Sequence, residues 1–97
     1  MRIIRRRRLR EFEALHPPAR PGLQLWYHTE RSRTWSSPTD IKQDYANASV
    51  IAGNRVVFNI GGNNYRLVVK FNYRYGVGYI RFIGTHAEYD KIDAAKI

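Results

Sequence analysis

Residues 55–73 read RVVFNIGGNNYRLVVKFNY, and their pattern predicts two β-strands joined by a tight turn. β-branched and aromatic residues fill both arms and favour extended strands, whereas the Gly/Asn segment 61–64 is typical of a hairpin turn. Along residues 65–73, every second side chain is apolar or aromatic, and the positions between them include Arg66 and Lys70. Successive side chains of a strand point to opposite faces. One face of this hairpin is therefore predicted to be core and the other charged.

Turn signals on either side of the hairpin add two further strands. Gly53-Asn54 precedes the first arm, and Tyr75-Gly76 follows the second. Tight connections of this kind join antiparallel neighbours, so the C-terminal half is predicted to be a meander. The four predicted strands cover residues 48–52, 55–60, 65–73 and 77–83.

The N-terminal half carries helical patterns instead. Leu9, Phe12 and Leu15 recur at helical spacing, and the segment HPP at 16–18 ends this first helix. The other elements predicted in this half are a second helix at about 19–33, a short helix at about 38–44 and an edge strand at 2–4. Helices first and strands after are typical of the α+β class. The N-terminal helices are therefore predicted to pack on one face of a small, mainly antiparallel, twisted sheet.

The composition bounds the number of domains and the kinds of partner. Ninety-seven residues, of which 43% are hydrophobic, predict a single domain over residues 1–97. The sequence has no cysteine, and the histidines at 16, 28 and 86 show no ligand spacing, so no disulfide, metal site or cofactor is expected. No apolar run has the length of a signal peptide or a membrane span. These features predict a cytoplasmic protein without a membrane partner.

The charge points to a polyanion. A formal net charge of +9 makes nucleic acid the first partner to test, and the alternative is that the charge gives solubility or matches an acidic protein. The strand residues that would share one face, if the registers allow, are Asn59, Arg66, Lys70 and Arg81. Cations on rigid strands suit both phosphate binding and stabilisation of a phosphoryl transition state. For any one of these residues, an ordinary solvated sheet face is the simpler interpretation.

The segment GTHAEYD, residues 84–90, carries a second set of candidates. Thr85 and Glu88 have the spacing of a capping box, which predicts a short helical turn with His86 at its first position. A histidine there could take a proton from a 2′-hydroxyl or give one to a leaving 5′-oxygen, and Tyr89 lies on the same side of the turn. The alternative is a satisfied turn histidine beside a core aromatic residue.

A metal-dependent nuclease is a further alternative, because Glu88, Asp90 and Asp93 lie close together in the sequence. Glu88 is already explained as the capping partner, and the other two as charges in the first turn of a helix. No metal ligands are therefore predicted.

Two segments together resemble the HigB toxins of bacterial toxin–antitoxin pairs. They are RVVFNIGGNNYRLV at 55–68 and IRFIGTHAEYDKID at 80–93. The likeness continues upstream in Leu9 to Phe12, Trp26-Tyr27, Trp35, Ser37-Pro38 and Asp40 to Lys42. The resemblance thus covers nearly the whole chain.

This resemblance implies a fold, an activity and partners. HigB toxins are similar to the RelE-like ribonucleases, which implies a small sheet packed on N-terminal helices and cleavage of mRNA, typically during translation on the ribosome. It also implies a HigA-like helix-turn-helix antitoxin that silences the toxin, with a toxin–antitoxin heterotetramer as the expected assembly.

The resemblance also implies roles for individual residues. Arg66 matches the arginine that handles the scissile phosphate, and His86 and Tyr89 fall where related toxins carry catalytic side chains. Lys70 and Arg81 are supported more by strand parity. One departure from the family is a uniformly basic run that could strengthen binding to RNA or to the ribosome; its members are Arg5, Arg6, Arg7 and Arg8.

The expected mechanism is metal-independent attack of a 2′-hydroxyl on the adjacent phosphate. His86 or Tyr89 would activate the hydroxyl, and Arg66 with Lys70 or Arg81 would stabilise charge. A rival from another class is a non-catalytic module that binds RNA or ribosomes through the same face. Its tyrosines could stack on bases if they pointed outward, and strand parity argues against this for Tyr65 and Tyr73 but leaves Tyr79 open. A third alternative is a structural partner of an acidic protein.

Overall fold

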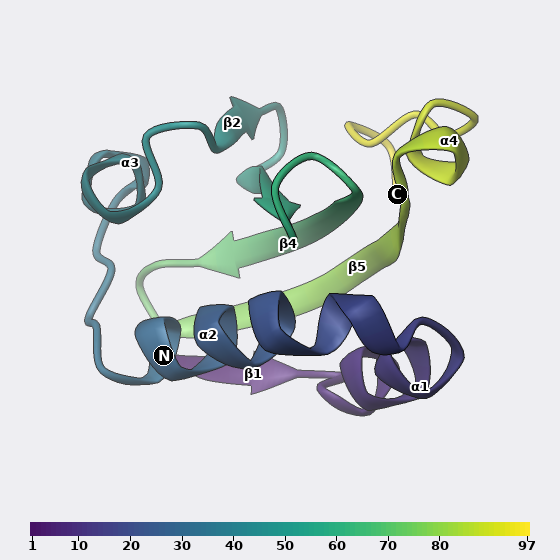
Figure 1. Ribbon diagram of the computed structural model, residues 1–97. Helices are drawn as coiled ribbons and strands as arrows, with labels where there is room; N and C mark the ends of the chain where they lie inside the picture. Colours follow the sequence, from purple (N-terminus) through teal and green to yellow (C-terminus); the bar gives the residue numbers. More distant parts are fainter.

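The computed structural model describes all 97 residues and shows helices followed by a meander of strands (Figure 1). The helices are α1 (Arg7–Leu15), α2 (Arg20–Arg31), α3 (Pro38–Asp44) and α4 (His86–Tyr89), with a 3-10 turn at Pro17–Ala19. The strands are β1 (Arg2–Ile4), β2 (Ser49–Ile51), β3 (Arg55–Ile60), β4 (Tyr65–Asn72) and β5 (Val77–Thr85). The predicted α+β class is confirmed, and the predicted elements agree with the observed ones apart from their end residues. None of the helices has the length and apolar content needed to cross a lipid bilayer.

The five strands form one sheet in the order β1-β5-β4-β3-β2. From β2 to β5, each strand pairs antiparallel with the next one along the chain. Gly61 and Gly62 in the β3–β4 turn have φ angles of 60° and 69°, a left-handed conformation that glycine adopts without steric cost. β1 forms the edge of the sheet opposite to β2 and runs parallel to β5. The prediction of a mainly antiparallel sheet is therefore confirmed.

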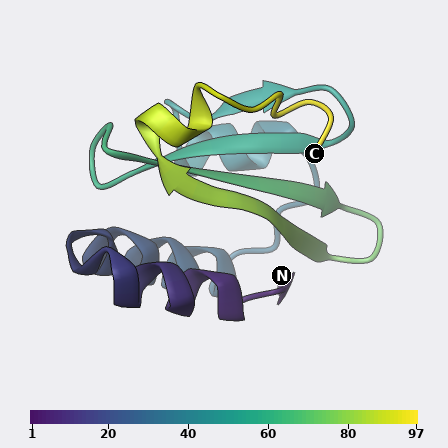
Figure 2. The ribbon, with the colours of Figure 1, turned by 90° about the vertical axis from the view of Figure 1, so that its right-hand side faces the viewer.

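The helices α1 and α2 cover one face of the sheet, as Figure 2 shows. Leu9 and Phe12 of α1 and Leu23 and Trp26 of α2 are buried in the main core, which the apolar face of β3 and β4 completes. Each pair is three residues apart, so both side chains lie on the same side of their helix. The amphipathic pattern of these helices therefore predicted their packing correctly.

An aromatic cluster forms the centre of this core. The Phe58 side chain is fully buried, and its ring centroid lies 5.4 Å from that of Trp26, 6.1 Å from Trp35, 5.3 Å from Tyr45 and 6.2 Å from Phe71. Most of these pairs meet edge to face, an arrangement that adds to the effect of burying their area. Phe58 therefore links both helical and strand elements of the core.

One expected core residue lies outside the core. Leu15, predicted on the buried face of the first helix, is 78% exposed. α1 ends at Leu15, and the next residue, His16, stacks on Phe12 with ring centroids 4.5 Å apart. His16 is one helical turn beyond Phe12, so it covers the position that helical spacing had given to Leu15.

The opposite face of the sheet is not uniformly charged, which corrects the expectation of one core face and one charged face. Val57 and Val68 lie opposite each other in the middle of β3 and β4, and both pack with Ala94 of the C-terminal segment. We call this group, with the partly buried residues packed on it, the second cluster; its members are Val57, Val68, Ala94, Ile51, Phe82, Tyr89 and Ile97. Figure 2 shows α4 and the C-terminal segment on this side of the sheet. Apolar side chains at mid-strand would otherwise contact water, so the chain folds back over them.

Glu30 of α2 is a buried carboxylate with an unusual titration. It is fully buried, and neither carboxylate oxygen has a hydrogen-bond partner, although the Met1 amino group lies 3.8 Å away. Burial raises the pKa of Glu30 to about 7, against the opposing effect of nearby positive charges.

We expect the free energy of unfolding to fall as the pH rises through the range from 4.5 to 7. In that range the folded protein holds the Glu30 proton, whereas the unfolded chain, with its ordinary pKa of 4.5, has released it. The loss is roughly 3 kcal/mol, at about 1.4 kcal/mol for each pH unit. Urea unfolding at several pH values would measure it. In Glu30→Gln the free energy of unfolding should no longer fall over this pH range, whereas in Glu13→Gln it should fall as in the wild type. An unchanged pH dependence in Glu30→Gln would show that Glu30 is not the titrating group.

Candidate functional site

The strand register places the predicted RNA-contacting residues of the sheet on the face opposite α1 and α2. Asn59 lies opposite Arg66 in the β3–β4 pair, and Lys70 follows Arg66 by four residues and so points to the same side. Lys70 lies opposite Tyr79 of β5 and lines a pocket together with Tyr79 and Arg81. The face that the sequence pattern predicted is therefore present.

Arg81 lies on this face at a β-bulge in β5, two residues after Tyr79. The register shifts between Val68 and Val69, which leaves Arg81 without a partner in β4. Arg8 of α1 contacts β5 at this point, because its Nη1 donates hydrogen bonds to the carbonyl oxygens of Arg81 at 3.0 Å and Ile80 at 3.4 Å. Arg8 thus has a structural role that its position in the basic run did not indicate.

The second cluster divides this face into two ends. Val68, in that cluster, lies between Arg66 and Lys70 on β4, and four residues of strand put those two positions about 13 Å apart. The Nη1 of Arg66 donates to the carbonyl oxygen of Asn63 at 3.0 Å, so its guanidinium turns away from Lys70. We call the end near the β3–β4 turn the turn end, with Arg66, and the other the pocket end, with Lys70 and Arg81.

His86 lies at the turn end because β5 runs directly into α4. The Glu88 backbone N–H donates to the Thr85 hydroxyl at 3.2 Å, and the Thr85 N–H donates to the Glu88 carboxylate at 2.8 Å, which is the predicted capping box. This bond from the Thr85 backbone lowers the pKa of Glu88. The His86 N–H donates to the carbonyl oxygen of Asn64 at 3.0 Å, so α4 is tied to the turn that precedes Arg66.

Gly84 makes this junction possible. It lies opposite Arg66 in the sheet, and a Cβ atom there would be 2.5 Å from Cζ of Phe82 and 3.1 Å from Oε1 of Glu88. Any larger residue would push the Phe82 ring out of the second cluster or disturb the capping box. The close packing of Phe82 and Glu88 therefore requires a glycine at this position of the GTHAEYD segment.

Asp90 orients the imidazole of His86, a role that the sequence analysis missed. The Nδ1 atom of His86 lies 3.0 Å from Oδ2 of Asp90. A carboxylate can only accept, so Nδ1 donates and Nε2 is left as the acceptor of the neutral ring. Both side chains are about half exposed, at 52% and 60%. Their spacing of four residues on a helix is the signal that could have revealed the pair.

Tyr89 combines a packed ring with an accessible hydroxyl. Its ring centroid lies 6.3 Å from that of Phe82, and the ring belongs to the second cluster. The hydroxyl is not among the buried polar atoms that lack a partner, and it makes no hydrogen bond within the protein, so it reaches solvent. Both interpretations of this tyrosine, packing residue and proton donor, are compatible with its position.

The acidic residues of this region have separate partners. Glu88 is held in the capping box and Asp90 by His86, while Asp93 lies 3.7 Å from Nζ of Lys96. The cations of the sheet face differ in this respect, because none of the ion pairs in the protein includes Arg66, Lys70 or Arg81. The unpaired cations therefore lie on the strands, whereas the carboxylates of Glu88 and Asp90 lie in and directly after α4.

The structure separates the four arginines of the basic run. The guanidinium of Arg6 lies 3.7 Å from the centre of the Tyr27 ring, a cation–π contact between α2 and the residue that precedes α1. Arg7 forms an exposed ion pair of 3.4 Å with the acidic residue one turn later. Arg8 is engaged with β5. Arg5 and Arg7 are exposed, whereas Arg6 and Arg8 are partly buried.

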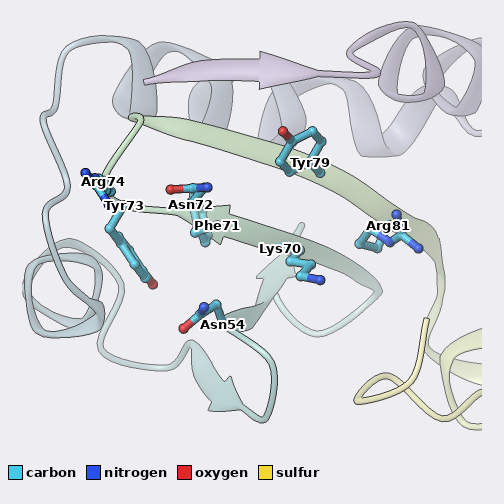
Figure 3. A pocket seen from close by; sticks show the side chains of 8 residues that line it. All are labelled: Asn54, Lys70, Phe71, Asn72, Tyr73, Arg74, Tyr79 and Arg81. Carbon is cyan, nitrogen blue, oxygen red and sulfur yellow. The ribbon is translucent and has the colours of Figure 1, made fainter.

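The pocket end contains a cavity of about 580 Å³ that sequence reasoning predicted only in part. Figure 3 shows side chains from β4, β5 and the two adjoining turns gathered around it. Its polar and exposed lining residues are Lys70, Arg81, Tyr79, Arg74, Asn54 and Asn72. Lys70 and Arg81 were expected on this face, while Asn54 and Arg74 are turn residues whose position depends on how the two hairpins pack.

Comparison with known proteins identifies the family. Residues 19–92 match the family described as HigB toxin, RelE-like toxic component of a toxin–antitoxin system. A search among curated proteins found no match. The match covers α2, α3, all of β2 to β5 and α4, and so includes both ends of the charged sheet face. The family implies an antitoxin as partner. The chain belongs to the HigB toxin family, the RelE-like toxic half of a toxin–antitoxin pair.

Proposed function

We propose that this toxin is an endoribonuclease that cleaves mRNA at the turn end of the sheet face, without a metal ion. The observation that carries the proposal is an exposed histidine, His86, oriented by Asp90 and held beside the strand of Arg66. A histidine–carboxylate pair next to an unneutralised arginine supplies the proton transfer and the charge stabilisation that cleavage of RNA requires.

In this mechanism His86 is the general base. Its Nε2 takes the proton of a ribose 2′-hydroxyl, and Asp90 stabilises the resulting imidazolium. The 2′-oxygen then forms a bond to the adjacent phosphorus while the bond from phosphorus to the 5′-oxygen breaks. The products are a 2′,3′-cyclic phosphate and a free 5′-hydroxyl.

Tyr89 and Arg66 complete the proposed chemistry. The accessible hydroxyl of Tyr89 gives its proton to the leaving 5′-oxygen, and the Arg66 guanidinium neutralises the charge that develops on the phosphate oxygens. Asn59 lies opposite Arg66; its Nδ2 already donates to a backbone carbonyl oxygen at 3.3 Å, and its second amide hydrogen would bond to the same phosphate. Lys70 lies about 13 Å from Arg66 along β4, and we propose that Lys70 and Arg81 hold neighbouring parts of the substrate.

The partners follow from the family and the charge. We propose that the substrate is mRNA on the ribosome, and that exposed cations such as Arg5 and Arg7 strengthen the contact with ribosomal RNA through phosphate neutralisation. We propose a HigA-like helix-turn-helix protein as the antitoxin and a heterotetramer as the silenced complex. With a ribosomal target, we also propose a cytoplasmic location.

Cleavage of a defined mRNA by the purified protein tests the proposal. We expect cutting that needs programmed ribosomes, continues in the presence of a chelator and leaves a 2′,3′-cyclic phosphate. Arg66→Gln is expected to lower the rate by about 10²–10³, the range found when one donor to a developing oxyanion is removed. Arg20→Gln, an exposed arginine on α2, is the matched control and should cut like the wild type.

Two results would contradict the proposal. If chelator stops the cutting, the metal-free mechanism is wrong. If no RNA is cut under any condition while RNA or ribosomes are still bound, the protein is a non-catalytic RNA- or ribosome-binding module, the second candidate. The exposed position of Tyr79 on the charged face is the observation that favours this second candidate.

A further inference from the structure

The pocket end of the sheet face carries chemical groups that the cleavage step does not use. Its cavity is lined by three cations, two asparagines and three aromatic residues, of which Tyr79 is the exposed one, and by no carboxylate. We propose that this cavity binds one nucleotide of single-stranded RNA, with the base stacked on Tyr79 and a phosphate held by Lys70 and Arg81. The inference rests on the proposed function, because the nucleotide belongs to the strand that is cut at the turn end.

The cations of the cavity are available to a phosphate. Lys70, Arg74 and Arg81 form no ion pair in the protein, and all three are exposed. Lys70 lies directly opposite Tyr79 in the sheet, and Arg81 follows Tyr79 by two residues, so the two positive charges lie on different sides of the ring. Figure 3 shows the side chains of Lys70, Tyr79 and Arg81 on this face of β4 and β5. A phosphate bound beside the ring would therefore be neutralised by a lysine and an arginine fork.

Tyr79 provides a fixed surface for a base. The residue is 40% exposed although its backbone is paired on both sides, with Ile4 of β1 and Lys70 of β4. Among the other tyrosines of this hairpin, Tyr65 is buried in the core, and Tyr73 packs on the core, lines the cavity and is only partly exposed. An aromatic ring on a rigid strand, open to solvent and surrounded by cations, is the arrangement with which proteins stack nucleobases. An acidic peptide would pair with the cations but carries no nucleobase to stack on the ring.

The two amides at the rim have hydrogen-bonding groups to spare. The Asn54 carbonyl oxygen accepts from the Phe71 N–H at 2.8 Å, which fixes the turn, and its side chain makes no hydrogen bond within the protein. The Asn72 side-chain oxygen accepts from the Tyr75 N–H at 3.2 Å, which leaves its NH₂ group as a free donor. Amides of this kind can read the edge of a base that lies on the tyrosine ring.

The position of the cavity fits a substrate strand that continues to His86. Both ends lie on the same face of the sheet, and the second cluster between them is apolar and therefore neutral towards a polyanion. The separation of about 13 Å between Arg66 and Lys70 is within the length of a short single strand. The cavity would then position the RNA several atoms away from the bond that breaks.

The first test is binding of an RNA pentamer that carries 2′-O-methyl groups and so cannot be cleaved. Fluorescence anisotropy with the full chain is expected to show a Kd about tenfold higher for Tyr79→Leu than for the wild type, in the range of one lost base–aromatic stack. Tyr79→Phe keeps the ring and should bind like the wild type. Tyr75→Leu is the matched control, because Tyr75 is 71% exposed on the adjacent turn and does not line the cavity.

Pentamers in which each base in turn is removed separate stacking from charge. One such abasic pentamer is expected to bind the wild type about tenfold more weakly, and Tyr79→Leu should no longer distinguish it from the intact pentamer. The phosphate contact has its own readout: Lys70→Gln should reduce the slope of log Kd against log salt by about 0.7, the value for one phosphate contact to a single strand. Lys96→Gln, an exposed lysine paired with Asp93, removes the same charge outside the cavity and should leave that slope unchanged.

The outcomes separate this inference from the proposed function, because the probe cannot be cleaved. If Tyr79→Leu binds the pentamer and cuts mRNA like the wild type, the nucleotide site is wrong while the ribonuclease stands. If no RNA is cut but the Tyr79 and abasic effects are found, the ribonuclease is wrong and the nucleotide site stands. The inference is also overturned if the wild type does not bind the pentamer. Equal competition by a hexaglutamate peptide, without any effect of Tyr79→Leu, would overturn it in favour of an acidic protein partner.

Discussion

Replacing His86 with alanine is expected to slow RNA cleavage by about 10²–10⁴, the contribution of one general base, while RNA binding stays within about twofold. The imidazole is half exposed and its only partner is Asp90, so its loss leaves no cavity and no buried polar group without a partner. The helix itself is held by the capping box and by the His86 backbone N–H, which alanine retains. Single-turnover cleavage on programmed ribosomes, beside ribosome pelleting for binding, measures both quantities.

Two further variants make this prediction specific. Asp90→Asn keeps the size of the orienting residue but removes its charge, so it should lower the rate less than His86→Ala does, because Nε2 is still present. His28→Ala removes an exposed histidine of α2, on the other side of the sheet, and should cut like the wild type. Full activity of His86→Ala would show that another group is the base, and a parallel loss of ribosome binding would make His86 a contact residue.

Phe58→Ala is expected to lower the free energy of unfolding by about 3–5 kcal/mol, the range found for a fully buried phenylalanine. The Phe58 side chain has no exposed area, and its ring contacts four other aromatic rings. Alanine would leave a cavity among large, stiff side chains that can collapse only in part. For a small domain this is a large part of the total stability. Urea unfolding followed by circular dichroism would measure the change.

The matched control for the core is an exposed aromatic residue. Tyr75 is 71% exposed, and Tyr75→Ala should change the free energy of unfolding by no more than about 0.5 kcal/mol. A loss below about 1 kcal/mol in Phe58→Ala would mean that the aromatic cluster is not packed as described. The two residues together thus test whether burial, and not aromatic character alone, stabilises the fold.

The elements and the family could be predicted from the sequence because their signals are local. Alternation along residues 65–73 marks the core face of β4, and the Gly/Asn segment 61–64 marks the turn. The capping box of Thr85 and Glu88 lies within four residues, so it placed α4 and the start of the His86 segment correctly. Strand parity likewise put Tyr65 and Tyr73 in the core.

The tertiary structure alone decided how these elements share the sheet face. The bulge at Arg81 reverses the alternation of β5 and turns Phe82 toward Val68, which no regular spacing predicts. The second cluster then divides the cations that the sequence had grouped, so Arg66 lies with His86 and Lys70 lies with Arg81 and Tyr79. The physical reason is that periodicity records which face each residue of one element prefers. Bulges, the fold-back of the C-terminal segment and the exposure of Leu15 instead depend on contacts between residues far apart in the chain, and only packing fixes these.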